Sequence, residues 1–160
     1  MAGNDLDKLE ILLGRDLHLD YRCAAGFYVY ADLRDEIRGS GHGLRDLKIS
    51  SGVETLRQAI ANRLKTRKGE LTALGHPEYG SRHFELIGQP NVERTRNLVK
   101  LYILQALKNE ARIEKVLKAD VKAEHTPPRE TVRIELNVKV IGQALPLEII
   151  VPFNLSEAAS

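Results

Sequence analysis

The sequence has few of the residues on which several common protein classes depend. It contains one cysteine, one methionine and no tryptophan among 160 residues, and aromatic residues make up only 5%. A single cysteine, Cys23, cannot form an internal disulfide, and a zinc site built from several cysteines is excluded with it. No apolar run reaches the roughly 20 residues that a membrane-spanning helix needs, so we expect no membrane partner. The acidic, polar first ten residues do not have the pattern of a secretory signal.

Charge is nearly balanced, with 24 Lys and Arg residues against 22 Asp and Glu residues and a formal net charge of +2. Nucleic-acid-binding proteins usually concentrate basic residues in a stripe or block, and no such block stands out here. We therefore expect no nucleic-acid partner. Hydrophobic residues make up 42% and charged residues 29%, which suits a soluble chain with a core of Leu, Ile and Val.

After residue 50 the spacing of apolar residues predicts two helices. Ser51 to Glu54 has the spacing of a capping box, in which a serine hydroxyl and a glutamate satisfy free amides at the helix start. Four apolar residues follow at helical spacing: Val53, Leu56, Ile60 and Leu64. The basic segment that ends in Gly69 predicts the end of this helix. A second helix is predicted to start near Asn91, with Asn91 as its N-cap, and to run to about Glu110.

Three strands are predicted after the helices. The first has five residues expected on one side: Ile113, Lys115, Leu117, Ala119 and Val121. Residues 132–140 alternate strictly between apolar and polar, and residues 147–153 supply the third strand. Pro127 and Pro128 mark a turn. The predicted fold class is α+β, with two helices packed on a three-stranded antiparallel sheet.

The first fifty residues show no sustained period and no internal repeat. We expect residues 1–50 to form an irregular N-terminal arm laid over a core of residues 51–160, the whole being one domain. Within the arm, Leu6 to Leu13 favour a short helical turn, residues 26–31 favour a strand, and Gly39 to Gly43 favour a flexible loop.

Catalytic and metal sites are disfavoured by the types and spacing of the polar residues. Glu70, Glu78 and Glu85 share the segment between the helices, and a glycosidase needs two carboxyls about 5–10 Å apart across a sugar cleft. An aromatic-lined cleft is not expected in a chain without tryptophan. The histidines are scattered, with no pair at the i, i+4 spacing of a helical metal site: His18, His42, His76, His83 and His125. We expect no catalytic residue, no cofactor and no metal.

Three segments resemble the motifs of one known family. A helix runs into Leu64 to Glu70, similar to a helix that ends in Thr-x-x-Gly-Glu. Pro77 to Ser81 is similar to a segment of proline, acidic residue, aromatic and glycine, and Asn109 to Ile113 is similar to Glu-Pro-Arg before a strand. Ala111 stands where that last motif has proline. In this order, residues 54–113 resemble the small baseplate wedge family of contractile-tailed phages, which often carries a lysozyme-like label.

The resemblance implies a structural subunit of a baseplate and not an enzyme. It implies a chain made in the bacterial cytoplasm and assembled into a phage tail baseplate or a related contractile injection particle. The implied partners are the larger wedge proteins and the sheath protein, with tube or hub proteins as further candidates, repeated six-fold around the tail. The subunit would link the wedge to the first sheath ring and initiate sheath assembly, for which an exposed sheet edge and ring avidity are suited.

Glu110 and Arg112 are the residues that the resemblance assigns to partner binding. From their spacing alone they are a solvated charge pair at a helix end, worth under about 1 kcal/mol. The sequence leaves open whether the parent machine is a phage, a type VI apparatus or an extracellular injection system. Two other functions also remain open: a small cytoplasmic regulatory adaptor that uses the same fold, and a peptidoglycan hydrolase.

Overall fold

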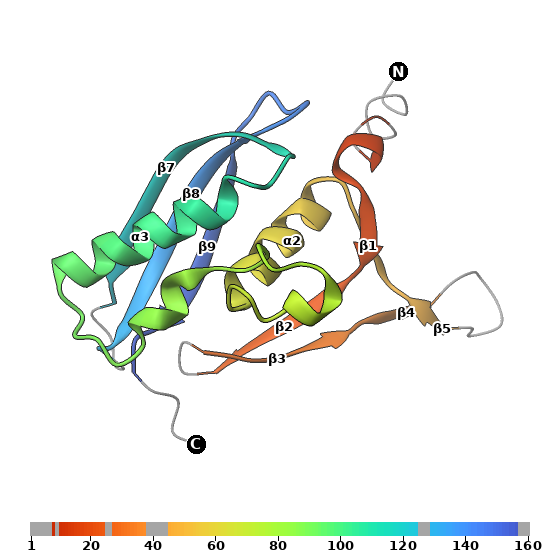
Figure 1. The fold of residues 1–160 in the computed structure, drawn as a ribbon. Coiled ribbons are helices and arrows are strands. Elements are labelled where there is room, and N and C mark those ends of the chain that lie inside the picture. The colour runs from red at the N-terminus through yellow and green to blue at the C-terminus, as the bar shows by residue number, and fades with distance from the viewer. Residues whose placement is uncertain (1–7, 9, 25–26, 38–44, 125–128, 157–160) are drawn as a thin grey trace.

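A computed structural model of the chain describes residues 8, 10–24, 27–37, 45–124 and 129–156. It combines helices with several antiparallel pairs of strands. In Figure 1, α3 lies against the sheet of β7, β8 and β9, and the narrow strand pairs of the N-terminal segment lie beside this part. In the part of the chain described, no helix is long and apolar enough to cross a membrane.

The C-terminal strands form the largest sheet. It contains β7 (Ile113–Ala123), β8 (Thr131–Val140) and β9 (Leu147–Asn154), antiparallel and in the order β7-β8-β9. All three predicted strands are therefore present. The alternation in β8 has its expected cause, because every second side chain of this central strand enters the core. The predicted turn at Pro127 and Pro128 lies outside the described residues.

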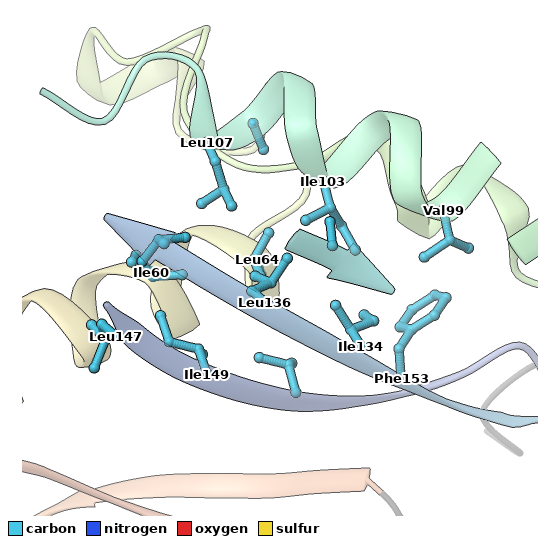
Figure 2. Packing of buried hydrophobic residues seen from close by; sticks show 14 of the residues in the cluster. Ile60, Leu64, Val99, Ile103, Leu107, Ile134, Leu136, Leu147, Ile149 and Phe153 are labelled. Carbon is cyan, nitrogen blue, oxygen red and sulfur yellow. The ribbon is translucent and has the colours of Figure 1, made fainter. Parts of the chain in front are cut away.

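The helices α2 (Val53–Lys65) and α3 (Glu93–Leu107) share one hydrophobic core with this sheet. In Figure 2, Val99, Ile103 and Leu107 of α3 point toward Ile134 and Leu136 of β8. The same cluster takes in side chains from α2 and β9: Ile60, Leu64, Leu147, Ile149 and Phe153. Burying one large aliphatic side chain stabilises a fold by about 2 kcal/mol, so this cluster is the main source of stability.

Both helices start differently from the prediction. Ser51 is the last residue of strand β6, and α2 begins after Gly52, which has a φ of +61° and no side-chain cap. The predicted capping box is therefore not formed, because strand pairing holds Ser51. The N-cap of α3 is Val92, and the Asn91 side chain instead donates a hydrogen bond to the Arg129 carbonyl oxygen at 2.9 Å.

Two bulges change which side chains of β7 face the core. The pairing of β7 with β8 shifts between Ile113 and Lys115 and again between Val116 and Lys118. Each bulge adds a residue and reverses the alternation that follows it. Lys115 and Leu117 are consequently exposed, whereas Val116 packs against the core. The prediction that both exposed residues share the side of Ile113 and Ala119 was wrong for this reason.

The N-terminal segment is built from paired strands and not from irregular chain. Its strands are β1 (Arg15–Leu17), β2 (Leu19–Ala24), β3 (Phe27–Leu33), β4 (Asp35–Ile37), β5 (Arg45–Leu47) and β6 (Ile49–Ser51). They form three two-stranded antiparallel ribbons, β1-β6, β2-β3 and β4-β5. The helical turn expected before Leu13 is seen at residues 10–13, and the predicted glycine-rich loop at 39–43 lies outside the described residues.

The three ribbons meet at a closed triangle of backbone hydrogen bonds. The His18 amide donates to the Lys48 carbonyl oxygen at 2.8 Å, the Lys48 amide to Arg34 at 2.7 Å, and the Arg34 amide to His18 at 3.4 Å. Each corner is preceded by Asp-Leu, and each aspartate accepts the amide of its leucine at 2.8 to 2.9 Å: Asp16, Asp32 and Asp46. The segment thus contains a threefold repeat of Asp-Leu-basic. This repeat is hard to recognise in the sequence because each unit is only three residues long and the spacing between units is unequal.

Candidate functional site

Two of the three family-like segments lie side by side in the structure. The Ser81 amide donates to the Thr66 carbonyl oxygen at 2.9 Å, and the Lys68 amide donates to the Ser81 carbonyl oxygen at 3.1 Å. These bonds form a short parallel bridge between Arg67 and Ser81. The chain between them turns through the 3-10 helix η1 (Thr72–Leu74), and a second 3-10 helix, η2 (Arg82–Leu86), follows. The segment after α2 is therefore tied back onto the end of that helix.

Gly80 allows this close approach. Its φ is +96°, and a Cβ at this position would lie 2.7 Å from the carbonyl oxygens of both Thr66 and Arg67. Neither the angle nor the distance accommodates an L side chain, so only glycine fits. The glycine of the Pro77 to Ser81 segment thus has a structural reason that is independent of any resemblance.

The third segment places a buried carboxylate at the junction between α3 and β7. Glu110 is 7% exposed, and its two oxygens accept from the Nε of Arg112 at 2.6 Å and the Nη2 of Arg112 at 3.1 Å. Such a two-bonded, charge-assisted contact is both stronger and more directional than a single ion pair. The expectation from spacing alone, a solvated charge pair at a helix end, therefore does not describe Glu110. The Arg112 side chain is 26% exposed.

Arg63 of α2 connects this carboxylate to the second segment. Its Nη2 lies 3.6 Å from the Glu110 Oε2, and its guanidinium carbon lies 4.5 Å from the centre of the Tyr79 ring. A guanidinium over an aromatic face is attracted by the ring's negative face. Burial raises the pKa of the Tyr79 hydroxyl, the neighbouring Arg63 works against this rise, and Glu110 adds to it. Arg63 therefore joins all three segments into one corner.

The N-terminal segment is fastened to the same corner. Arg112 Nη1 donates to the backbone carbonyl oxygen of Leu13 at 3.1 Å, and the Leu13 side chain is fully buried in the core. We call the residues Leu13, Arg63, Tyr79, Glu110 and Arg112 the braced corner.

The comparisons with known proteins identify the family. The model of the family described as baseplate wedge protein gp25 matches residues 50–144, more than half of the chain. The chain belongs to the gp25 baseplate wedge family. This family is structural, and membership implies assembly with other baseplate components in a phage tail. A search of curated proteins finds no match.

A solved structure supports the fold of this gp25-family chain. It is a crystal structure at 1.44 Å resolution, provisionally described as a tail lysozyme from Geobacter sulfurreducens, with a TM-score of 0.59 and 22% identity. The match covers 96% of that protein but only 69% of this chain. At this identity the likeness concerns the fold alone.

In the braced corner of the gp25-family chain, two opposing influences act on the Glu110 carboxyl group. Burial favours a higher pKa for Glu110, but hydrogen bonds from Arg112 and the charges of Arg112 and Arg63 outweigh it, so the net pKa is lowered. The carboxylate is ionised at neutral pH and already shared between two guanidinium groups. Its hydrogen bonds with Arg112 lie between the end of α3 and the start of β7.

The other candidate carboxylates are used locally. Glu70 accepts the Arg67 amide at 2.9 Å, Glu78 pairs with Lys68 at 2.8 Å, and Glu85 pairs with Arg82 at 2.9 Å. Each thus has a basic or backbone partner of its own within the loop.

The described histidines His18 and His83 lie in separate surroundings. His83 is buried against Phe84 and Phe153, with its Nδ1 2.8 Å from the Ser81 hydroxyl oxygen, and burial lowers its pKa to about 4. His18 is bonded to Ser50, whereas His42 and His125 lie outside the described residues. Among the residues described, no group of three metal-ligating side chains occurs.

The sequence pointed to Glu110 and Arg112 but not to their companions. Arg63 is one of several polar residues on α2, so the helical pattern does not single it out. Because Arg63 and Glu110 are far apart in the sequence, their contact could not be predicted from local spacing. The role of Leu13 could not be seen at all, because the acceptor is a backbone carbonyl, which every residue has.

Proposed function

We propose that this chain is a non-catalytic adaptor of the baseplate, which links the larger wedge proteins to the first sheath ring and initiates sheath assembly. The observation that supports this most is the braced corner. It fixes α2, α3, the N-terminal segment and the start of β7 relative to one another. A subunit that starts a ring of other subunits must present its sheet at a fixed angle, and buried charge pairs with defined geometry provide this.

We propose that Arg112 is the member of the pair that reaches a neighbouring chain. Its side chain is 26% exposed, whereas Glu110 is buried and can act only by orienting Arg112. In this proposal Ala111 is acceptable in place of the family's proline because the salt bridges already define the turn.

The assembly we propose follows the family. The chain is made in the bacterial cytoplasm and incorporated into a tail baseplate with six-fold repetition, where it binds wedge proteins and sheath, with tube or hub proteins as further partners. Residues 1–50 act as an arm on the core of residues 51–160. Strand β6 spans the boundary between these two parts, and it pairs with β1 of the arm. The three-stranded sheet supplies backbone edges for strand pairing with neighbours.

The test is co-purification of the tagged chain with the products of its neighbouring genes. We expect the native chain to capture sheath and wedge proteins, and Arg112→Ala to lose that capture while remaining folded by circular dichroism. Arg82→Ala is the matched control, because Arg82 pairs with Glu85 and lies over the Tyr102 ring, and neither of these partners belongs to the braced corner. Failure of the native chain to capture either protein would favour the solitary regulatory adaptor.

A hydrolase function is tested separately, because the similar crystal structure carries a lysozyme description. We expect no loss of turbidity when the folded chain is added to a suspension of purified peptidoglycan, with hen egg-white lysozyme as the positive control. Clearing of the suspension, abolished by a substitution of one of the loop glutamates, would overturn the non-catalytic proposal.

A further inference from the structure

The strands β1 to β6, which we call the three-ribbon unit, join the rest of the chain at two glycines. The chain enters the unit after Gly14 and leaves it through Gly52, with φ values of +86° and +61°. The Gly52 amide donates to the Gly14 carbonyl oxygen at 3.1 Å, and the pairing of Arg15 with Ser51 begins directly beyond this bond. Both connections therefore lie side by side, at residues that can absorb a change in backbone angle as hinges do.

The three-ribbon unit is not part of the hydrophobic core. Leu13, which directly precedes Gly14, is fully buried in that core. Among the strand residues of the unit whose side chains the structure describes, none belongs to the core cluster or packs against it. The position of the unit on the rest of the chain therefore depends mainly on polar contacts.

Gln58 of α2 makes the first of these contacts. The Leu19 amide donates to the Gln58 Oε1 at 2.8 Å, and the Gln58 Nε2 donates to the Leu17 carbonyl oxygen at 2.7 Å. One side-chain amide thus satisfies a donor and an acceptor of the unit where β1 passes into β2. Because such a bond can be exchanged for bonds to water, it contributes less to the closed position than buried apolar surface would.

Tyr21 of β2 makes the second set of contacts with α2. Its hydroxyl donates to the Asn62 Oδ1, and the Lys65 Nζ lies 3.1 Å from the centre of its ring. Gln58, Asn62 and Lys65 follow one another at helical spacing and form one polar stripe along α2. Polar contacts of this kind are typical of parts of a chain that move relative to one another.

The three-ribbon unit lies along the outer edge of β9. A groove of about 720 Å³ separates residues 18–21, mostly of β2, from residues 146–151, mostly of β9. The groove is lined by consecutive residues of β9, as at a strand edge, because a sheet face presents only every second residue. In the described part of the chain, β9 pairs with β8 on one side only. Figures 1 and 2 show the ribbon of β2 and β3 passing below β9.

This ribbon leaves too little room for another strand beside β9. Cα atoms of β3 and β9 approach within 8 Å of each other. A strand between them would need about 9–10 Å, because neighbouring strands lie about 4.8 Å apart. Covering an edge in this way is one means by which proteins prevent unwanted pairing with other chains. The full edge of β9 is therefore accessible only when the three-ribbon unit turns away from it.

We propose that the three-ribbon unit is a hinged cover over this edge. It turns about Gly14 and Gly52 and is held closed by the polar stripe of α2. In the free chain the closed state predominates and protects the edge, and docking of the sheath protein at the sheet opens the cover. Nearly all of the unit precedes the part of the chain that the gp25 family model matches. The identity of the opening partner rests on the proposed function, whereas the hinge and its polar contacts do not.

Double electron–electron resonance measures the opening in the full chain. Spin labels are attached at Asp20→Cys and Glu148→Cys, two exposed residues on opposite walls of the groove. Cys23→Ser first removes the single native cysteine. We expect one short, narrow distance between the labels in the chain that is otherwise native, since the open state of such an equilibrium is a minor one.

The variant with both Gln58→Ala and Asn62→Ala should show a second, longer distance. Loss of the hydrogen bonds at the polar stripe should raise the open fraction about tenfold or more. Arg57→Ala is the matched control on the same helix, because Arg57 pairs with Glu54 of α2, and it should leave the distance unchanged.

Tyr21→Phe is a milder variant that removes only the hydroxyl donated to Asn62. It should raise the open fraction by a smaller factor in the same direction, and it keeps the test valid if the double variant does not fold. Equal distance distributions in the native chain and in every folded variant of the polar stripe would overturn the hinged cover.

Purified sheath protein, added to the labelled native chain, tests what opens the cover. We expect the longer distance on binding, and an association rate about fivefold or more higher for the variants, because a scarce open state limits binding to the native chain. Binding with the short distance retained would overturn the proposal. If no sheath protein binds, the proposed function fails, whereas the comparison of the variants without sheath protein still decides whether the unit is hinged.

Discussion

Arg112 donates a hydrogen bond from its Nη1 to the carbonyl oxygen of Leu13, 99 residues earlier in the chain. The same guanidinium holds the buried Glu110 with its other two nitrogens. One side chain thus connects the start of the sheet, the end of α3 and the entry to the N-terminal segment. This arrangement predicts that the pair contributes to stability as well as to assembly.

We expect Glu110→Ala to lower the free energy of unfolding by about 3 kcal/mol, because it leaves Arg63 and Arg112 without their shared, buried counter-charge. Urea denaturation followed by circular dichroism measures the change. Glu114→Ala is the control, since Glu114 pairs with Lys139 on the surface and should cost under about 1 kcal/mol. Equal effects of the two substitutions would contradict the structural role of the braced corner.

Gly80→Ala should destabilise the chain more than Gly75→Ala does. Both glycines have positive φ, but a Cβ at Gly75 meets open space, whereas at Gly80 it meets two carbonyl oxygens at 2.7 Å. We expect a loss of about 1 kcal/mol for Gly75→Ala, from the backbone angle alone, and of about 3 kcal/mol or more for Gly80→Ala. Thermal melts of the two variants measure this difference, and similar melting temperatures would show that the loop is free to move away.

Because His83 is buried, we expect the folded chain to lose stability in mild acid. Burial lowers its pKa from 6.5 to about 4, so the unfolded chain takes up a proton at a higher pH than the folded chain. Stability should therefore fall as the pH drops from about 6.5 to about 4, by up to about 3 kcal/mol. Because Glu110 also has a lowered pKa, its contribution is lost only as the pH falls below the ordinary glutamate range.

The variant His83→Gln separates the contribution of His83 from that of Glu110. Glutamine keeps a polar partner for Ser81 but cannot take up a proton in this pH range. Unfolding by urea should be measured at several values between pH 4 and pH 7. We expect the slope of stability against pH to flatten in the variant across this interval. An unchanged slope would mean that another group causes the acid sensitivity.

Gln58→Ala should loosen the N-terminal segment without unfolding the core. The substitution removes two hydrogen bonds, to the Leu17 carbonyl oxygen and from the Leu19 amide, and should cost about 2 kcal/mol. Hydrogen exchange at residues 15–21 should accelerate more than exchange in β8. Gln105→Ala, on the exposed side of α3, is the matched control and should change neither. Uniform acceleration in all strands would show that the segment is not a separate opening unit.

Local pattern was sufficient for the elements of the C-terminal part. The helical spacing of Leu56, Ile60 and Leu64 and the alternation of residues 132–140 reflect burial on one side, which is repeated at every turn or every second residue. The bulges in β7 could not be predicted, because a bulge is decided by pairing with β8 and leaves no regular mark in the strand itself.

The N-terminal segment shows the limit of local pattern more clearly. Its strands are mostly three residues long, too short for a period, and the triangle at His18, Arg34 and Lys48 is made by backbone groups alone. The sequence by itself determined the core elements and drew attention to Glu110 and Arg112, because burial and motif spacing are local properties. Only the tertiary structure decided that Arg63, Tyr79 and Leu13 complete the corner and that β9 opens into a groove, because those contacts join segments far apart in the chain.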